Sequence, residues 1–595
     1  MTRSLSGPSL ATDPQPHLLA ALWRWAEQDP ERPLLSHREG DALQGWTAAS
    51  LRSEVTALAA GLIARGVAPG DRVALLSRTR VEWVLLDHAI LAAGAVTVPI
   101  YDSASPAQVR TILANSGARL VLVETEAHAA IVAEATTPVD GAAAPTGPSS
   151  APIEVLGLAS GVLAELQATG THHLDAVEAR VAALQGDDLA AILYSSGTTG
   201  EPKGCELTHA NLCANVAQTV QQVPELFGEG ARTLVFLPLA HALGRIQVHV
   251  AFDQGVEVVV ACGLDELPEE LAVAGPTFLV AVPRLFEKVL AGARERAREG
   301  GRLRIFDRAL AVAAKVSMRR RGGRPVPVWL RVQHAVLDRL VGQRLRDALG
   351  GRVSLAICGG APLLPEVGHR FDGIGIPILE GFGTTETAPI VSGGPAQPLE
   401  IGTVGRPYPA TTVRLDEDGE ILVRGPQVFR GYRDDAAATA SALVDGWYRT
   451  GDLGDITETG HLRIIGRKKD ILVTAGGKNV VPAPLEERIR AHPLVEECVV
   501  LGDGRPFVTA LVWVDPARLQ DGHGAEAEAD LRAELDGVVA AANRTVSRAE
   551  SIGRYAIVTE PLSLEAGSLT PTAKVRRAAV LERFAEPIDQ LYRTR

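Results

Sequence analysis

The stretch Tyr194-Ser195-Ser196-Gly197-Thr198-Thr199-Gly200-Glu201-Pro202-Lys203-Gly204 is the most informative part of this 595-residue sequence, and it directly follows a strand-like run at residues 191–193. Its three glycines let backbone amides approach an anion closely, four Ser and Thr hydroxyls add donors, and Lys203 adds positive charge. It is not a Walker A loop, because Gly200 is followed by Glu-Pro rather than by Lys and a hydroxyl residue. We therefore expect a phosphate-binding loop; an ordinary surface turn is the weaker alternative.

The composition is that of a multidomain globular protein. Hydrophobic residues make up 46% and charged residues 22% of the chain. With about 150 residues per domain as a guide, the length predicts more than one domain. The formal net charge of −12 argues against a nucleic-acid binder, because such proteins need a broad basic surface. An anionic substrate would have to be held by a local cluster of positive charge.

The cysteines and the apolar segments favour a cytoplasmic protein. The first 16 residues lack the apolar core of a signal peptide, and the longest apolar stretch, residues 84–100, is interrupted by Asp87 and His88. The five cysteines include no CxxC pair and no zinc-ligand spacing, which indicates buried thiols in a reducing compartment: Cys205, Cys213, Cys262, Cys358 and Cys498.

Lysine is rare in this chain. Only seven of the 59 basic residues are lysines, and the others are arginines. An ammonium is a compact point charge, whereas a guanidinium is a broad planar fork, so a retained lysine indicates a task that arginine does not perform. A chance distribution is the alternative. Five of the seven fall in local sequence motifs: Lys203, Lys468, Lys469, Lys478 and Lys574.

Short β-branched runs alternate with Ala- and Leu-rich amphipathic segments, which predicts an α/β fold with largely parallel sheets. Two strand-like runs around Asp418-Gly419 predict an antiparallel hairpin, and residues 136–152, rich in Pro, Gly and Ser, predict a surface loop. After residue 470 the pattern predicts a compact α+β domain. The expected strands are 72–76, 191–194, 233–237, 277–282, 354–357, 376–379 and 555–559, with helices at 48–65, 107–116 and 525–542 and a strand–turn–strand at 495–514.

Residues 283–350 form a mostly helical stretch that is rich in arginine. A membrane-surface or acidic-partner helix at 303–321 is one interpretation of its basic run at 319–321. A solvated helix face is the simpler interpretation, and we favour it. The apolar residues of this segment are Ile305, Leu310, Val312 and Val316.

Seven motifs in order, beginning with the phosphate loop, resemble the adenylate-forming superfamily of acyl-CoA synthetases, luciferases and nonribosomal-peptide adenylation domains. The similarity spans residues 194–574, and residues 282–289, 476–486 and 569–577 make the chain most similar to bacterial long-chain fatty acyl-CoA synthetases. The six motifs after the loop are Phe236-Leu237-Pro238-Leu239-Ala240-His241, Gly359-Gly360-Ala361-Pro362-Leu363, Glu380-Gly381-Phe382-Gly383-Thr384-Thr385-Glu386-Thr387, Tyr448-Arg449-Thr450-Gly451-Asp452, Gly466-Arg467-Lys468-Lys469-Asp470 and Leu569-Thr570-Pro571-Thr572-Ala573-Lys574.

The resemblance implies an α/β fold with a large N-terminal ATP- and acyl-binding domain at residues 1–466. That domain would contain two parallel-rich αβ subdomains and a small β-barrel-like subdomain. Residues 467–470 would form a hinge, and residues 471–595 a small, mobile α+β domain that carries the catalytic lysine.

The resemblance also assigns a nucleotide site. Glu386 and the Ser195 hydroxyl would hold magnesium, and a plain helix-N-terminal carboxylate is the alternative for Glu386. Asp452 would accept both ribose hydroxyls, and a turn aspartate is the alternative. Phe382 stands where the family commonly stacks a tyrosine on adenine. The other nucleotide-binding residues would be Ser196, Gly197, Thr198, Thr199, Gly200, Lys203, Gly359, Gly360, Ala361, Gly381, Gly383, Thr384, Thr385, Arg467 and Lys574.

By the same resemblance, four residues would act in catalysis. Thr198, Lys203 and Glu386 would contact the phosphates or the metal, and Lys574 would bridge the α-phosphate and the attacking carboxylate. Without the family match, Lys574 would be interpreted as a solvated residue of a basic run.

The resemblance further implies two poses of the small domain. Lys469 would be the hinge residue whose rotation exchanges them, and Gly477 and Lys478 would then replace Lys574 and line the CoA entry. His241 would border the acyl pocket as a gate, and a structural histidine is an equal alternative.

The implied activity is the ATP-dependent activation of a medium- to long-chain fatty acid to acyl-AMP, followed by transfer to CoA. ATP, Mg²⁺ and CoA are the implied cofactor and co-substrates, and no nucleic-acid partner is expected. Two other functions stay open: a fatty acyl-AMP ligase that loads a carrier protein, and a non-catalytic nucleotide-binding regulator. Peripheral membrane contact and a homodimer also stay open.

Overall fold

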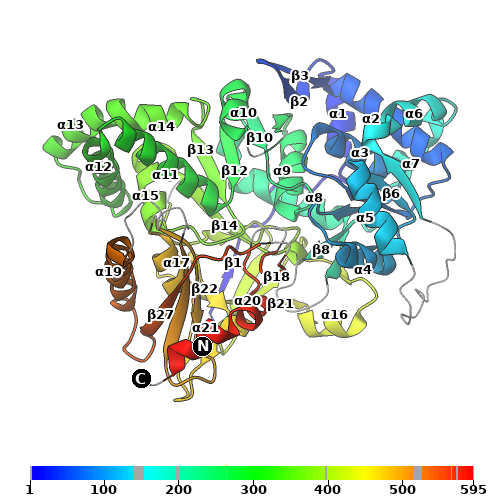
Figure 1. The fold of residues 1–595 in the computed structure, drawn as a ribbon. Helices are drawn as coiled ribbons and strands as arrows, with labels where there is room; N and C mark the ends of the chain where they lie inside the picture. Colours follow the sequence, from blue (N-terminus) through cyan, green and yellow to red (C-terminus); the bar gives the residue numbers. More distant parts are fainter. Residues whose placement is uncertain are drawn as a thin grey trace.

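The computed structural model describes residues 3–137, 153–195, 202–261, 263, 266–394, 399–492, 494–514, 525–563, 566–570 and 574–593 (Figure 1). Most of the surface loop expected at 136–152 lies outside these ranges, as does Cys262. The expected phosphate-loop residues Ser196, Gly197, Thr198, Thr199 and Gly200 lie outside them too, and so does the side chain of Ser195.

A seven-stranded, mostly parallel sheet forms the right side of the molecule in Figure 1. Its order is β19-β9-β8-β5-β4-β6-β7, and the first two pairings are antiparallel. The strands are β19 (Gly431–Tyr432), β9 (Lys203–Thr208), β8 (Leu189–Ser195), β5 (Val96–Ile100), β4 (Arg72–Leu76), β6 (Leu120–Val123) and β7 (Glu154–Gly157).

Helices cover both faces of this sheet. In β4, Ala74 and Leu76 join the core beneath α4 (Pro106–Ser116) and α5 (Glu126–Thr136). Val73 and Leu75 join the larger core beneath α2 (Ala48–Ala64) and α3 (Val81–Ala92). This alternation explains the continuous apolar run, because a parallel strand is buried on both faces.

A second, nine-stranded sheet has the order β16-β15-β14-β13-β12-β10-β11-β2-β3. Its six central strands are parallel: β14 (Ile378–Phe382), β13 (Leu355–Cys358), β12 (Phe278–Ala281), β10 (Arg232–Val235), β11 (Glu257–Val260) and β2 (Pro33–Glu39). The antiparallel edge strands are β16 (Arg406–Pro407), β15 (Ser392–Gly393) and β3 (Ala42–Thr47). The helices beside it include α8 (His209–Gln222), α9 (Ala242–Asp253), α11 (Pro283–Glu299), α12 (Leu303–Arg321), α13 (Val328–Leu337), α14 (Gln343–Asp347) and α15 (Pro365–Gly373).

A third, antiparallel sheet of six strands contains the hairpin predicted at Asp418-Gly419. Its ladder runs β1-β17-β18-β21-β20 with β22 on β21, and among the described strands it does not close, so this subdomain is an open sheet rather than a complete barrel. The strands are β1 (Ser4–Ser6), β17 (Thr412–Leu415), β18 (Glu420–Arg424), β20 (Leu443–Val444), β21 (Trp447–Ile456) and β22 (Leu462–Arg467).

The C-terminal part, orange to red in Figure 1, is a small α+β unit. One face of its three-stranded sheet packs on α17 (Ala483–Arg490) and α19 (Ala525–Asn543), and the other on α20 (Arg577–Arg583) and α21 (Ala585–Tyr592). The sheet contains β25 (Val495–Leu501), β26 (Val508–Val514) and β27 (Ile552–Val558), and a separate pair contains β23 (Leu472–Val473) and β24 (Asn479–Val480).

The predicted α/β class is therefore confirmed, with two parallel-rich units, a small antiparallel unit and an α+β C-terminal unit. β22 ends at Arg467 and the 3-10 turn Lys468–Asp470 follows, at the place of the predicted hinge. No helix of the described chain is long and apolar enough to cross a bilayer.

Candidate active site

One cavity of about 1600 Å³ lies where the two parallel sheets, the antiparallel sheet and the C-terminal unit meet. The ends of β8, β13 and β14 reach its wall. In open parallel sheets, ligands bind outside the carboxyl ends of the strands, which is where these residues lie. A cavity of this size accommodates more than one small ligand.

The phosphate end of the cavity is marked by Lys203. The β8–β9 pairing places Ser195 opposite Lys203, so the expected phosphate loop connects two neighbouring antiparallel strands. The exposed Lys203 ammonium lies 5.2 Å from the ring centroid of Tyr432. Lys203, the lysine of the predicted loop, therefore presents a positive charge to the cavity.

The predicted adenine-side residues follow two neighbouring parallel strands. Gly359, Gly360 and Ala361 come directly after β13, and Gly381 and Phe382 end β14. Gly360 has a φ of +82°, a conformation that other residues rarely adopt. All five line the cavity, so the structure brings these two motifs together.

Glu386 is a buried carboxylate on the short turn Thr385–Thr387, and it lines the cavity with Thr384 and Thr385. The Tyr432 hydroxyl donates to Glu386 Oε1 at 2.9 Å. Burial, followed by the negative charge of Glu386, raises the pKa of Tyr432 and keeps that hydroxyl a donor. Gly383 lines the same wall, where a Cβ would clash with the Pro389 carbonyl oxygen.

Asp452 and Arg467 face each other across β21 and β22. Arg467 Nε lies 3.0 Å from Asp452 Oδ1, and Asp452 is buried. Burial raises the pKa of Asp452, and the positive charges of Arg467 and Lys574 oppose that rise. These cations favour the ionised carboxylate, the form that accepts two hydroxyl donors.

Lys574 belongs to the C-terminal unit and lines the same cavity. A tight loop holds its backbone, since the Lys574 N–H donates to Thr570 Oγ1 at 3.0 Å and the Thr570 N–H donates to the Lys574 carbonyl at 2.7 Å. The side chain is exposed to the cavity, but the cavity walls withdraw it from bulk water. This desolvation, with the charge of Arg467, lowers the pKa of Lys574 from 10.5 to about 8, against an opposing effect of Asp452.

His241 also lines the cavity, at the N-terminus of α9. Its Nδ1 accepts a hydrogen bond from the Leu243 N–H at 3.2 Å, so the ring caps the helix as well. Burial, with a contribution from the Lys574 charge, lowers the pKa of His241 to about 4. The ring is therefore neutral at physiological pH, and both interpretations of His241 remain open.

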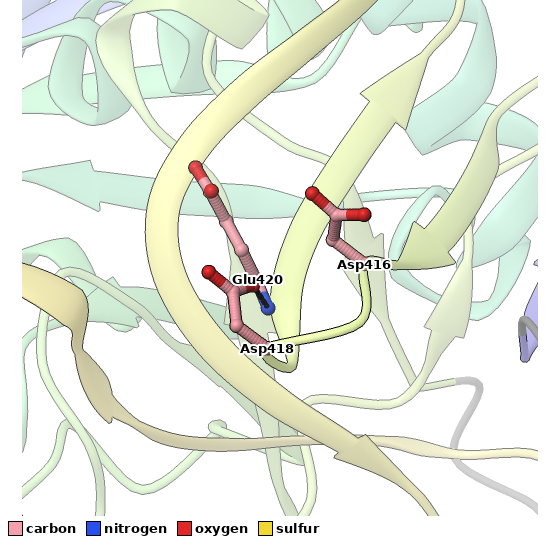
Figure 2. Close-up of side chains that lie close together, drawn as sticks. All are labelled: Asp416, Asp418 and Glu420. Atoms are coloured by element: carbon pink, nitrogen blue, oxygen red, sulfur yellow. Dashed lines mark hydrogen bonds between the residues drawn. The ribbon is translucent and has the colours of Figure 1, made fainter.

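Three carboxylates gather at the β17–β18 hairpin, as Figure 2 shows. One oxygen each of Asp416, Asp418 and Glu420 lies within 4.8 Å of the others, and the Glu420 N–H donates to Asp418 Oδ1 at 3.1 Å. By composition such a group could hold a metal ion, but protein cations already pair with these carboxylates.

Lys468 and Arg449 are these cations. Lys468 Nζ lies 2.5 Å from Asp418 Oδ2 and 3.1 Å from Glu420 Oε2. Arg449 Nη2 lies 2.5 Å from the same oxygen of Glu420. Glu420 also accepts the Gly451 N–H at 3.1 Å. Buried Glu420 therefore joins Lys468 of the predicted hinge to Gly451, the residue of β21 that precedes Asp452.

The predicted hinge residue and the predicted CoA-entry residues lie differently with respect to the cavity. Lys469, the predicted hinge residue, lines the cavity, and burial lowers its pKa. Gly477 and Lys478 are not part of the described cavity wall, and Lys478 Nζ lies 3.4 Å from Glu550 Oε1. The structure thus presents Lys574, and not the predicted CoA-entry residues, to the nucleotide end.

Sequence reasoning missed two residues of this wall. Tyr432 contacts both Glu386 and Lys203, yet no motif identified it. Glu380 opens a recognised motif but received no role; its carboxylate is buried and accepts the Leu363 N–H at 3.1 Å and the Gly402 N–H at 3.3 Å. Burial raises the pKa of Glu380 to about 7, against the effect of these bonds. The signal that could have found it is a carboxylate at the end of a buried strand.

The chain matches known proteins over nearly its whole length. The AMP-binding enzyme family model covers residues 22–433, and the AMP-binding enzyme C-terminal domain model covers residues 469–595. The Mycobacterium bovis protein named "Long-chain-fatty-acid--CoA ligase FadD15" is 42% identical, with 97% of each chain covered. The Arabidopsis thaliana protein named "Long chain acyl-CoA synthetase 6, peroxisomal" is 33% identical, with 90% of this chain and 80% of that chain covered.

A solved structure shows the same fold at lower identity. The Bacillus subtilis O-succinylbenzoate coenzyme A synthetase, solved with ATP and magnesium ion, is 20% identical and superimposes with a TM-score of 0.69 over 95% of this chain and 99% of that one. Fold, motif order and full-length identity agree with one another. The chain belongs to the AMP-binding, adenylate-forming enzyme family, and within it to the fatty acyl-CoA synthetases.

Proposed function

We propose that this chain is a long-chain fatty acid–CoA ligase that carries out two half-reactions at one cavity. In the first, a carboxylate oxygen of the fatty acid attacks the α-phosphorus of ATP, the bond to pyrophosphate breaks, and acyl-AMP forms. In the second, the CoA sulfur attacks the acyl carbon, the thiol proton is lost, and AMP leaves. The 42% identity to a relative named for this activity supports the assignment.

The observation that carries the proposal is the convergence of Lys574, Asp452 and Glu386 on one cavity, although they come from three parts of the chain. Both reactants of the first step are anions, so positive charge must screen their repulsion. Lys574 would do so between the α-phosphate and the fatty acid carboxylate. Asp452 would position the ribose and thereby the α-phosphate.

Several residues would hold the rest of ATP. Lys203, with the hydroxyls of Thr198 and Thr385, would contact phosphate oxygens, and Phe382 would stack on adenine. Arg467 would contact the ribose or the phosphates while it holds Asp452. Backbone amides of the glycine-rich segments would approach the nucleotide closely.

Magnesium would be held by Glu386 and the hydroxyl of Ser195. The buried Glu386 carboxylate supplies the oxygen ligands that this hard cation prefers, and the hydrogen bond from Tyr432 is accepted by Oε1, one of its two oxygens. When bound, the ion would neutralise charge on the phosphates.

The fatty acid would enter beside the start of α9. Ala240, Leu243 and Ile357 give this part of the cavity wall an apolar character, and neutral His241 stands among them. An acyl chain is stabilised by such apolar contacts, while a neutral imidazole adds no charge that would compete for the carboxylate.

The second half-reaction would use another pose of the C-terminal unit. Rotation at Lys469 would withdraw Lys574 and bring Gly477 and Lys478 to the cavity, where they would line the CoA entry. A carrier-protein thiol is the alternative acceptor, and no contact among the described residues favours it. A homodimer stays a prediction, which light scattering of the purified chain tests.

The substrate class is tested by initial-rate measurements on fatty acids from short to long chain, with ATP, Mg²⁺ and CoA present. Pyrophosphate release should be highest with a medium or long chain and should depend on CoA for turnover. Equal rates with acetate, or no release with any fatty acid, would contradict the proposed substrate class. The regulator alternative predicts nucleotide binding without pyrophosphate release.

A further inference from the structure

An exposed apolar stripe runs along α13 (Val328–Leu337) and the turn of π-helix that follows it, Asp338–Gly342. The exposed fractions reach 72% at Val328 and 65% at Trp329. We call this set the α13 stripe; its members are Val328, Trp329, Val332, Val336 and Leu340. From Trp329 on, the spacing of three and four residues places them on one side of the helix. A contiguous apolar surface of this kind indicates an interaction site.

α13 also has buried apolar residues, so the exposed stripe is not the side by which this helix packs on the core. Leu330 packs with Val312 and Val316 of α12, and Leu337 joins that cluster. α13 thus has one apolar side that is buried on α12 and a second apolar side that is exposed. The apolar residues of α12 itself are mostly buried, which fits the interpretation of α12 as an ordinary helix of the fold. The candidate for a membrane-surface helix is therefore α13.

Around the stripe lies a strongly cationic surface. From residue 302 to 346 the sequence holds 12 basic and two acidic residues, in a chain whose net charge is −12. Both acids are paired, Asp307 with Arg294 and Asp338 with Arg346. The exposed basic residues are Arg302, Arg304, Arg308, Lys315, Arg319, Arg320, Arg324, Arg331, Arg339 and Arg344.

Within the described chain, none of these ten basic residues has a carboxylate within ion-pair distance. Arg319 and Arg331 donate instead to the backbone carbonyls of Pro325 and Val326. In Figure 1, α12, α13 and α14 lie at the upper left end of the molecule, so this surface can meet a large partner without obstruction by the seven-stranded sheet at the right.

We propose that the α13 stripe and its surrounding arginines dock this protein on an anionic lipid surface. Apolar side chains with an interfacial tryptophan would enter the headgroup boundary, and the arginines would contact lipid phosphates. The inference rests on the proposed function in one respect, because a membrane also holds the fatty acid that the cavity would take up.

Charge complementarity favours an anionic lipid surface over two other partners, a second copy of this chain and a nucleic acid. A second copy docked through the same face would bring ten uncompensated cations of each chain together, which opposes association. A nucleic acid would satisfy the arginines but would leave the apolar stripe against phosphates and water. An anionic bilayer satisfies both parts of the surface.

Vesicle flotation of the full chain tests the proposal, with vesicles of phosphatidylcholine alone or mixed with phosphatidylglycerol. We expect binding to the mixed vesicles to be at least about tenfold stronger than to phosphatidylcholine, and to weaken with salt. The double variant V332E/V336E should lose binding, and R319Q/R320Q/R324Q should retain only weak, salt-insensitive binding. Equal binding of the wild type and V332E/V336E would overturn the proposal.

Matched controls are available on the same chain. Leu174 is an exposed apolar residue of another helix (43% exposed), and Arg119, Arg544 and Arg548 are exposed arginines outside this face. L174E and R119Q/R544Q/R548Q should bind vesicles like the wild type. All the substituted side chains are exposed, so the circular dichroism melt should be unchanged.

Other outcomes would assign the surface differently. Absence of wild-type flotation, together with a dimer that V332E/V336E dissociates, would identify the face as a self-association surface. Retention on duplex DNA in place of vesicles would identify a nucleic-acid surface. Either result would overturn lipid docking. Ligase activity on dissolved fatty acid is measured in parallel: its absence with intact flotation would reject only the proposed function, and intact activity without flotation would reject only the docking.

Discussion

The cations of the cavity and the cations of the α12–α13 surface are arranged in opposite ways. In the cavity, the walls withdraw Lys574 from bulk water, and Arg467 pairs with the buried carboxylate of Asp452. On the outer surface, ten basic residues are exposed and have no carboxylate partner in the described chain. A lysine whose ammonium must reach one phosphate cannot be replaced by another residue. The electrostatic potential of an exposed surface depends instead on the sum of its charges. We therefore expect single substitutions to matter greatly in the cavity and little on the surface.

Lys574→Ala should show the largest effect. Removal of one preorganised positive charge from a site where anions react costs about 100- to 1,000-fold in rate. We expect this loss in acyl-AMP formation, while thioester formation from supplied acyl-AMP stays near the wild-type rate. Lys574→Arg is the control for charge without the compact ammonium. Equal losses in both half-reactions would remove the role assigned to Lys574.

Lys469→Pro should show the reverse pattern. Lys469 lies in a 3-10 turn, whose helical φ a proline can adopt, but the ring would resist the rotation to a second pose. At a cost of about 3 kcal/mol for that pose, thioester formation should fall about 100-fold while acyl-AMP formation persists. Lys469→Ala removes the charge but keeps the backbone free, so it should form thioester normally. Unchanged thioester formation in the proline variant would argue against a two-pose cycle.

The pH profile distinguishes a desolvated lysine from a surface one. The pKa of Lys574 lies near 8, so the side chain is protonated below that pH and loses its charge as the pH rises through it. We expect kcat/KM for acyl-AMP formation to fall about tenfold per pH unit above 8, because kcat/KM reports the free enzyme. Lys574→Arg, slower but always charged, should lack this fall. A wild-type profile that stays level up to pH 10 would contradict the assignment.

Glu420→Gln should show the smallest effect of this series. It removes the carboxylate that joins Lys468, Arg449 and the Gly451 N–H, so the part of β21 that precedes Asp452 should become less well positioned. Because both cations are partly exposed, we expect at most about 1 kcal/mol, or about fivefold, seen mainly in KM for ATP. Asp455→Asn breaks an exposed ion pair of the same sheet with Arg3 and should change nothing. Equal effects of the two variants on KM for ATP would contradict the positioning role of Glu420.

The cavity was largely predictable from sequence because its residues occur in local motifs. Gly359, Gly381 and Arg467 stand at or just after the ends of short strands, and strand order brings them to one wall. Asp452 lies within the longer strand β21, directly opposite Arg467. Tyr432 was missed because its contact with Glu386 depends on the pairing of β19 with β9, a long-range contact that no spacing reveals.

The outer surface was only partly predictable. The arginine-rich composition was visible, but periodicity suggested α12 as the exposed amphipathic helix. α13 carries apolar residues on two sides, and sequence alone does not tell which side packs on α12. The ion pairs between the hairpin carboxylates and Lys468 were equally unpredictable from sequence, because they join residues about 50 positions apart that only the tertiary structure brings together.

Mass spectrometry of the products, with ATP, Mg²⁺ and a long-chain fatty acid in the presence and absence of CoA, tests the central claim most directly. Two half-reactions at one cavity predict acyl-CoA and AMP in equal amounts when CoA is present, and only enzyme-bound acyl-AMP when it is absent. Acyl-AMP that accumulates while CoA stays unconsumed would contradict the claim and identify a ligase that serves another thiol.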